Sequence, residues 1–169
     1  MRNGWRRRSG SVEWSAPQTP QNGPYYATPS WDQTLPAATR FVVLANFSND
    51  AVLDRETGLV WSLSTFPDFI WVGAVRFCRN SRIGGRGGWR LPTLEELLSL
   101  TDSTGAIPPT FVVGPAVTWS ATTDEIITTD AWIVTSFGSG SNGLQPLDKN
   151  QSAQAFCVRG GAGNTSPTN

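Results

Sequence analysis

Histidine is absent from all 169 residues of the sequence. It is the commonest general base and metal ligand in proteins, and its charge changes near neutral pH. Serine and threonine are plentiful, but without histidine no ordinary arrangement for activating their hydroxyls is available. We therefore expect a protein that is not an enzyme and that has no cofactor.

Cysteine is nearly absent as well, since only Cys78 and Cys157 are present. No Cys-x-x-Cys pair exists, which excludes zinc ribbons and thioredoxin-type redox sites. Apolar runs of transmembrane length are also missing, so we expect no membrane insertion. The formal net charge is zero. No global field attracts nucleic acid, and we expect no nucleic-acid partner.

Charge is nevertheless distributed unevenly along the chain. Residues 1–40 carry five arginines and two acids, a net charge of +3, whereas residues 41–169 carry eight basic and eleven acidic residues, a net charge of −3. Ordinary solvated charge explains this pattern, and a contact between a basic arm and an acidic body is the alternative. No hydrophobic stretch follows the N-terminal arginines, so this end does not read as a secretory signal peptide as it stands.

Residues 1–45 are predicted to form an extended arm. Prolines spread through it interrupt any helical or alternating period, and a disordered tail would have much the same composition. Disordered tails are usually poor in aromatic residues, however, and this segment carries Trp5, Trp14, Tyr25, Tyr26 and Trp31. We therefore expect the arm to dock onto its own body or a neighbouring subunit. Residues 46–160 are expected to form one folded domain and residues 161–169 a flexible tail.

The body alternates short apolar runs with turn residues. A β-hairpin is predicted for residues 41–64, and a helix from Pro67 to about Arg79, because proline is tolerated in a first helical turn. Thr93 and Glu96 have the spacing of a capping box, in which each side chain satisfies a backbone amide of the other residue. Apolar residues at helical spacing follow, which predicts a second helix.

The C-terminal third reads as strands and loops. Three strands are predicted at residues 117–120, 131–134 and 155–158, and two polar loops at residues 121–130 and 136–152 separate them. Strands and helices are thus segregated along the chain. This order indicates an α+β fold with an antiparallel sheet.

Six segments, in this order, resemble a known family: DRETGLVW (54–61), WVGAVRFC (71–78), GGRGGWRLPTLEELLSLTD (84–102), WSAT (119–122), AWIV (131–134) and FCVRG (156–160). They cover about residues 50–160 and look like the Lcl C-terminal domain family, the head domain of bacterial collagen-like adhesins. The motif GWRLPT-x-EEL is the most specific of them. The resemblance implies a C-type-lectin-like fold, with two helices flanking a small twisted antiparallel sheet and long loops gathered on one side.

The resemblance also implies that Cys78 and Cys157 are neighbours, as a disulfide or at least a close pair. Two buried free thiols acting as small apolar side chains are the alternative, which a reducing cytosol would favour. Sulfatase-activating enzymes share the broad fold and use a reactive cysteine pair with copper. Here the two cysteines fall on a helix and a core strand, the arrangement of a structural pair, so an enzyme of that type is the least favoured function.

Recognition is expected in the two polar loops. Asp124, Glu125 and Asp130 could collect a Ca²⁺ ion, although solvated loop acids are the ordinary explanation. The segment Gln145-Pro146-Leu147-Asp148 is only loosely similar to the sugar-binding motifs of calcium-dependent lectins. The ligand-binding candidates in the loops are Asp124, Glu125, Asp130, Asn142, Gln145, Asp148 and Lys149.

A second candidate is a basic patch around the glycine loop, formed by Arg76, Arg79, Arg82, Arg86 and Arg90. Clustered on one face, these arginines could bind sulfated or carboxylated glycans by bidentate contacts. The alternative is that each pairs with a nearby acid such as Asp68, Glu95 or Asp102.

We interpret the sequence as a non-enzymatic recognition or assembly module, with a virion surface or decoration protein of a phage as the favoured setting. Its lectin-like domain would bind a glycan or protein receptor, while residues 1–40 attach it to itself or to other particle subunits. A homo-oligomer is expected, and a trimer would fit. The alternative is a secreted bacterial adhesin that binds sulfated glycans outside the cell.

Overall fold

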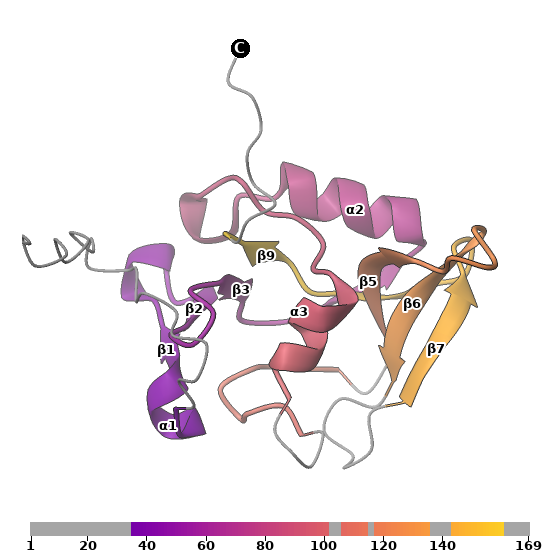
Figure 1. Ribbon diagram of the computed structural model, residues 1–169. Coiled ribbons are helices and arrows are strands. Elements are labelled where there is room, and N and C mark those ends of the chain that lie inside the picture. Colours follow the sequence, from indigo (N-terminus) through magenta and orange to yellow (C-terminus); the bar gives the residue numbers. More distant parts are fainter. Residues whose placement is uncertain (1–34, 102–105, 115–116, 136–142, 161–169) are drawn as a thin grey trace, which may run out of the picture.

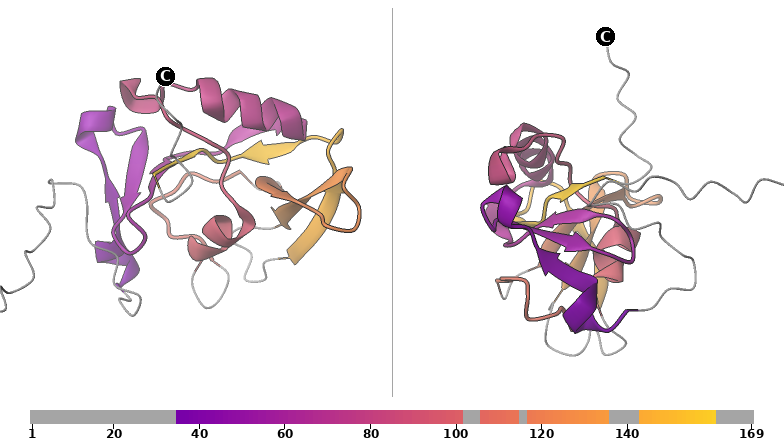
Figure 2. Two further views of the ribbon diagram at one scale, coloured as in Figure 1. Left: turned by 45° about the horizontal axis from the view of Figure 1, so that its top comes forward. Right: turned by 90° about the vertical axis from the view of Figure 1, so that its left-hand side faces the viewer.

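The computed structural model of the protein describes residues 35–101, 106–114, 117–135 and 143–160. Within these ranges the fold is α+β, with three α-helices and nine strands in two curled sheets (Figures 1 and 2). The aromatic residues predicted to dock the arm all lie before residue 35, outside the described part of the chain. None of the helices in the described ranges has the length and apolar character needed to cross a membrane.

The first sheet contains the two ends of the domain. Its order is β1-β2-β3-β9, and every neighbouring pair is antiparallel; the strands are β1 (Phe41–Val43), β2 (Ala51–Asp54), β3 (Val60–Ser62) and β9 (Val158–Arg159). The predicted hairpin is therefore present. Residues 35–45, which the sequence assigned to the arm, include α1 (Ala37–Arg40) and β1. Because β1 pairs with β2 and buries Phe41, this segment belongs to the folded domain.

The second sheet has the order β4-β8-β5-β6-β7; the strands are β4 (Phe66–Phe69), β8 (Ala153–Ala155), β5 (Thr118–Thr123), β6 (Asp130–Thr135) and β7 (Gly143–Asp148). Its pairs are antiparallel except β5 and β8, which are parallel. The expectation of a purely antiparallel sheet is corrected at this point. Strand β8, which follows β7, lies between β4 and β5. Because β4 and β5 run in opposite directions, β8 can be antiparallel to only one of them.

Two helices cover the sheets. Helix α2 (Trp71–Asn80) buries Ala74 and Cys78 in a cluster with Trp119, and α3 (Leu94–Ser99) buries Leu97 in a second cluster with Trp61 and Phe156. The capping box of α3 is confirmed: the Glu96 backbone N–H donates to Thr93 Oγ1 at 3.3 Å, and the Thr93 backbone N–H donates to Glu96 Oε2 at 2.9 Å.

Three sequence predictions about elements were wrong. Pro67 and Asp68 do not start a helix but lie in β4, an edge strand in which proline needs no ladder partner. The predicted last strand is two short strands in different sheets, β8 and β9. The predicted loop 136–152 contains β7, whose exposed, proline-containing sequence lacks the usual strand pattern.

Candidate functional site

A hollow of about 160 Å³ lies where the first hairpin meets the glycine loop and the last strand. Its apolar lining consists of Leu44, Leu53 and Val60 of the first hairpin and Phe47 of the 3₁₀ turn η1 (Ala45–Phe47). Two arginines lie next to these residues. These residues, which we call the arginine hollow, are Leu44, Phe47, Leu53, Val60, Arg86 and Arg159.

The two arginines share one aromatic ring. The Cζ atom of Arg86 lies 5.1 Å from the ring centroid of Phe47, and that of Arg159 lies 6.0 Å from the same centroid. Neither guanidinium forms a salt bridge with a carboxylate of the described residues. Two positive charges therefore flank an apolar, aromatic hollow with no neutralising acid in the described ranges, and guanidinium groups can bind an anionic group by charge-assisted bonds.

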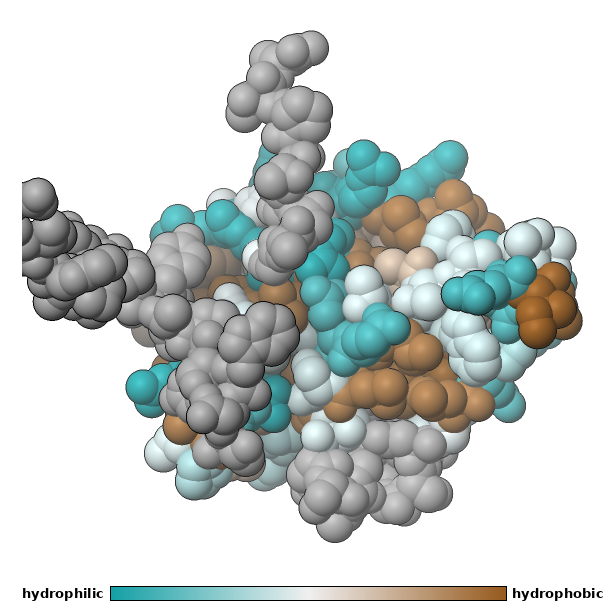
Figure 3. Space-filling model, viewed as in Figure 1, coloured by the Kyte–Doolittle hydropathy of each residue, from teal (hydrophilic) through white to brown (hydrophobic). Residues whose placement is uncertain are grey.

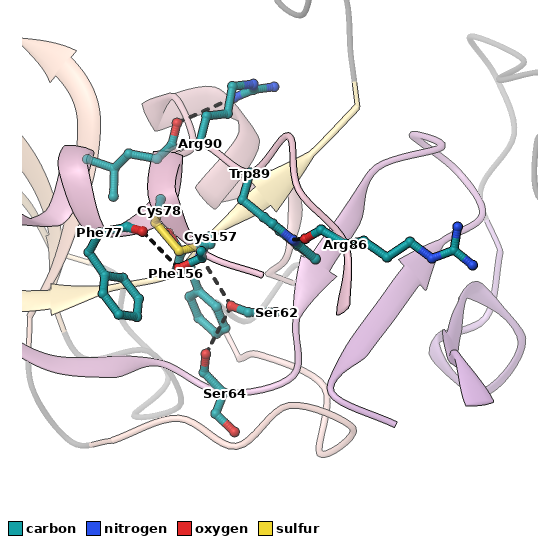
Figure 4. Close-up of a disulfide and its surroundings, with 11 residues drawn as sticks. Ser62, Ser64, Phe77, Cys78, Arg86, Trp89, Arg90, Phe156 and Cys157 are labelled. Carbon is teal, nitrogen blue, oxygen red and sulfur yellow. Dashed lines mark hydrogen bonds between the residues drawn. A yellow bond between two sulfur atoms is a disulfide. The ribbon is translucent and has the colours of Figure 1, made fainter. Parts of the chain in front are cut away.

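Arg159 is positioned by three contacts of the last strand. It lies opposite Val60 in the β3–β9 ladder. The preceding residue, Val158, exchanges two backbone hydrogen bonds of 2.9 Å with Arg90 of the glycine-loop segment. Two residues before Arg159, Cys157 forms a disulfide with Cys78 on α2, with 5.4 Å between their α-carbons (Figure 4). The pair implied by the family resemblance is therefore present as a disulfide, and no cysteine is free.

Arg86 is positioned by the glycine loop. The Trp89 indole Nε1 donates a 2.6 Å hydrogen bond to the Arg86 carbonyl oxygen, and the Trp89 ring packs edge-on against Phe47. In Figure 4 the Arg86 side chain extends away from the disulfide. Gly84 of the 3₁₀ turn η2 (Ile83–Gly85) touches Phe47 directly, at a φ of 59° that favours glycine. The glycine loop thus holds Phe47 and Arg86 together.

Arg90 is less available to a ligand than Arg86, because its guanidinium already has partners within the protein. Its guanidinium forms a salt bridge of 2.6 Å with Glu96 and donates to the Gly160 carbonyl oxygen. Burial of the Glu96 carboxyl would by itself raise its pKa, but the hydrogen bonds from Arg90 and from the Thr93 backbone, with the charge of Arg90, lower the pKa below its usual value. For Arg90, pairing with an acid is correct, although its partner is Glu96.

The remaining predicted arginines lie apart from the hollow. Arg76 and Arg79 are exposed on α2. The guanidinium of Arg82 packs over Gly87, where an added β-carbon would fall 2.1 Å from its Nη1 atom. The predicted patch therefore contributes only Arg86 to the hollow. Arg159 was missed, because it lies 73 residues from Arg86 along the sequence.

Three of the predicted loop residues, Asp124, Glu125 and Lys149, lie in the turn between β5 and β6 and in the turn that follows β7. Asp124 is buried, and its Oδ1 accepts hydrogen bonds from the backbone N–H groups of Ile126 and Ile127, so it has a structural role in the turn. Lys149 donates to the Thr128 carbonyl oxygen and lies 4.8 Å from the Trp71 ring centroid. Glu125 is exposed.

The other loop candidates belong to strands. Asp130 begins β6, and Gln145 and Asp148 lie in β7, with Asp130 directly opposite Asp148. Asn142 lies outside the described residues. Within the described ranges, no three acidic or other metal-ligating side chains are grouped to hold an ion, so the Ca²⁺ site proposed for Asp124, Glu125 and Asp130 has no assembled ligand set.

Comparison with known proteins identifies the family. The model of the Lcl C-terminal domain family matches residues 50–159, about two thirds of the chain. The protein belongs to the Lcl C-terminal domain family. The resemblance found in the sequence is thereby confirmed. The matched range begins before β2 and ends at Arg159, so it contains every residue of the arginine hollow except Leu44 and Phe47.

Membership in this family indicates an adhesin-type module of a surface or extracellular protein. No curated protein and no solved structure matched the chain.

Proposed function

We propose that this Lcl domain is a non-enzymatic recognition module that binds acidic glycans, sulfated or carboxylated, through the arginine hollow. The observation that carries the proposal is the pair Arg86 and Arg159, which flank Phe47 with no salt-bridge partner among the described residues. A flat guanidinium can bind a sulfate or carboxylate through two hydrogen bonds, and the apolar floor can pack against a sugar ring.

The hollow supports this ligand better than the turn between β5 and β6 and the turn that follows β7 do. Asp124 and Lys149 of those turns already make several intramolecular contacts, whereas neither arginine of the hollow has a salt-bridge partner in the described part of the chain. The proposal includes no catalytic step and no cofactor. It rests on charge and shape alone, and the expected affinity is modest for one subsite.

Heparin oligosaccharides provide the test, with binding measured by calorimetry at low and physiological salt. Arg86→Gln and Arg159→Gln should each weaken binding several-fold, and the double variant should abolish it. Arg79→Gln is the matched control, because Arg79 is an exposed arginine on α2, away from the hollow. Chemically desulfated heparin should bind far more weakly. Equal losses in all three single variants would show only diffuse charge attraction and would contradict the site.

We further propose a C-type-lectin-like fold for the domain and display on a virion surface, with a secreted adhesin as the alternative setting. The adjacency of β3 and β9, near the two ends of the matched range, and the two main helices support the fold. The aromatic residues before residue 35 support attachment to a larger particle. Immunogold labelling of purified particles would test the setting, and labelling confined to cell surfaces would favour the adhesin.

A further inference from the structure

One face of the β6–β7 ladder is left open in the described part of the molecule. In the register of these strands Val134 pairs with Leu144 and Trp132 pairs with Pro146, so the four side chains share a face. Val134 is fully buried in the cluster that includes Leu97 of α3, Trp132 is half-buried, and Leu144 is 43% exposed. Helix α3 therefore covers the inner part of this face and leaves its outer edge uncovered.

The turn that leads into β6 adds two isoleucines at the Asp130 end of this ladder, the opposite end from the Val134–Leu144 pair. Ile126 is 92% exposed and Ile127 is 50% exposed. Figure 3 shows apolar surface at the end of the molecule where β5 turns into β6. The isoleucines are held in place, because Asp124 accepts hydrogen bonds from both of their backbone N–H groups. Apolar surface that is held outward in this way is typical of an interaction site.

Acidic residues accompany this surface. Asp130 and Asp148 lie directly opposite each other, an arrangement that is unfavourable unless a cation intervenes. Neither forms a salt bridge in the described ranges, and exposed Glu125 adds a third negative charge nearby. Lys149, in the turn that follows β7, lies against Trp71 and Thr128 instead. A fitting partner is therefore positively charged and carries apolar or aromatic side chains.

The geometry disfavours simple extension of the sheet. Strand β7 is at the edge, but Pro146 at its centre has no N–H to donate. A partner must therefore pack its side chains on the open face and the isoleucine turn. We call these residues the acidic end: Ile126, Ile127, Asp130, Trp132, Leu144, Pro146 and Asp148.

Residues 1–34 of this same chain have the complementary chemistry. They contain four arginines against two acids, with Trp5 among the arginines and four prolines further on. They join the domain at α1, which lies at the opposite end of the molecule from β7 (Figures 1 and 2). Thirty-four residues can span up to about 110 Å when extended, enough to reach a neighbouring copy.

We propose that residues 1–34 of one copy bind the acidic end of a second copy. The arginines pair with Asp130 and Asp148, and the aromatic residues pack on Trp132 and the isoleucine turn. Because donor and acceptor surfaces differ, the contact is head-to-tail and generates a closed ring or an open filament. This contact concerns assembly and is independent of glycan binding in the arginine hollow.

The test measures the mass of the full-length protein by sedimentation over a range of concentrations and salt. The wild-type protein should associate, and association should weaken in high salt. The double variant Asp130→Asn/Asp148→Asn and the triple variant Arg6→Gln/Arg7→Gln/Arg8→Gln should each weaken it by about tenfold. Asp68→Asn is the matched control, because Asp68 is an exposed acid in β4 whose φ of 60° asparagine also adopts. Circular dichroism and a thermal melt verify that each variant is folded.

Charge reversal sharpens the test. Asp130→Lys/Asp148→Lys should abolish association, and adding Arg6→Asp and Arg7→Asp in the same chain should restore it. A wild-type protein that is monomeric at all concentrations overturns the proposal, and this includes the case in which the arm binds its own domain. Association that survives Asp130→Asn/Asp148→Asn, or that Asp68→Asn weakens equally, also overturns it.

Discussion

Gly84 lies directly against Phe47. A β-carbon placed on Gly84 would fall 2.5 Å from the Phe47 β-carbon and 2.6 Å from its carbonyl oxygen, closer than any real side chain comes. The glycine loop of the family motif therefore touches the backbone and β-carbon of Phe47, the residue over whose ring Arg86 and Arg159 lie. This contact couples the packing of the motif to the shape of the arginine hollow.

Gly84→Ala should destabilise the protein more than Gly85→Ala. Both residues have positive φ, 59° and 72°, which costs about 1 kcal/mol for alanine, but the space beside Gly85 is open. Alanine at Gly84 must also displace Phe47, which adds roughly 1–3 kcal/mol. Urea denaturation of the two variants measures the difference. Equal losses would mean that the Phe47 turn moves aside freely.

Removing the Cys78–Cys157 disulfide should lower the free energy of unfolding by roughly 3–5 kcal/mol, because the bond closes a long loop in the unfolded chain. The two cysteines are separated by 79 positions. Denaturation with and without a reductant measures this loss. The variant Cys78→Ala/Cys157→Ala is the control and should be indifferent to reductant. A wild-type protein of unchanged stability under reducing conditions would contradict the prediction.

Asp54→Asn should cost about 3–5 kcal/mol, because it leaves the guanidinium of Arg40 without its buried counter-ion. The Asp54 side chain is fully buried, and its Oδ2 lies 2.7 Å from Arg40 Nη2. Glu56→Gln removes the second, less buried partner of Arg40 and should cost about 1 kcal/mol or less. Thermal and urea unfolding compare the two. A larger loss in Glu56→Gln would reverse the assignment.

Glu96 should make stability depend on acid pH. Burial alone would raise its pKa, but the hydrogen bonds from Arg90 and from the Thr93 backbone, with the charge of Arg90, bring the pKa in the folded protein below the ordinary 4.5. A carboxyl with a lowered pKa stabilises the fold fully above its unfolded pKa and loses that contribution as pH falls through the folded value. Glu96→Gln should therefore cost about 1 kcal/mol at pH 7 and progressively less below pH 4.5.

The comparison for Glu96 is Glu95→Gln, which changes an exposed acid in the same turn of α3. Urea denaturation at pH 7 and pH 3 measures the stability of the wild-type protein, Glu96→Gln and Glu95→Gln. The effect of Glu95→Gln should be small at both pH values. A difference between the wild-type protein and Glu96→Gln that persists unchanged at pH 3 would contradict the prediction.

Local features of the fold could be predicted from the sequence. The capping box of Thr93 and Glu96, the helix that follows and the glycine loop before it depend on residues a few positions apart. The prediction failed where neighbours in space decided the outcome. Pro67 and Asp68 suit a first helical turn as well as an edge strand, and pairing with β8 selected the strand. Strand β7 became recognisable only through its six pairs with β6.

For the arginine hollow too, some features follow from the sequence and others only from the tertiary structure. The sequence by itself determined the family and placed Arg86 and Arg90 in one basic segment. Only the tertiary structure decided which of them has an acidic partner among the described residues, because Glu96 neutralises Arg90 while Arg86 joins Arg159 over Phe47. Motifs record interactions between residues that are close along the chain. Whether a charge is paired depends on distances between segments, and those are set when β9, the glycine loop and the first hairpin pack together.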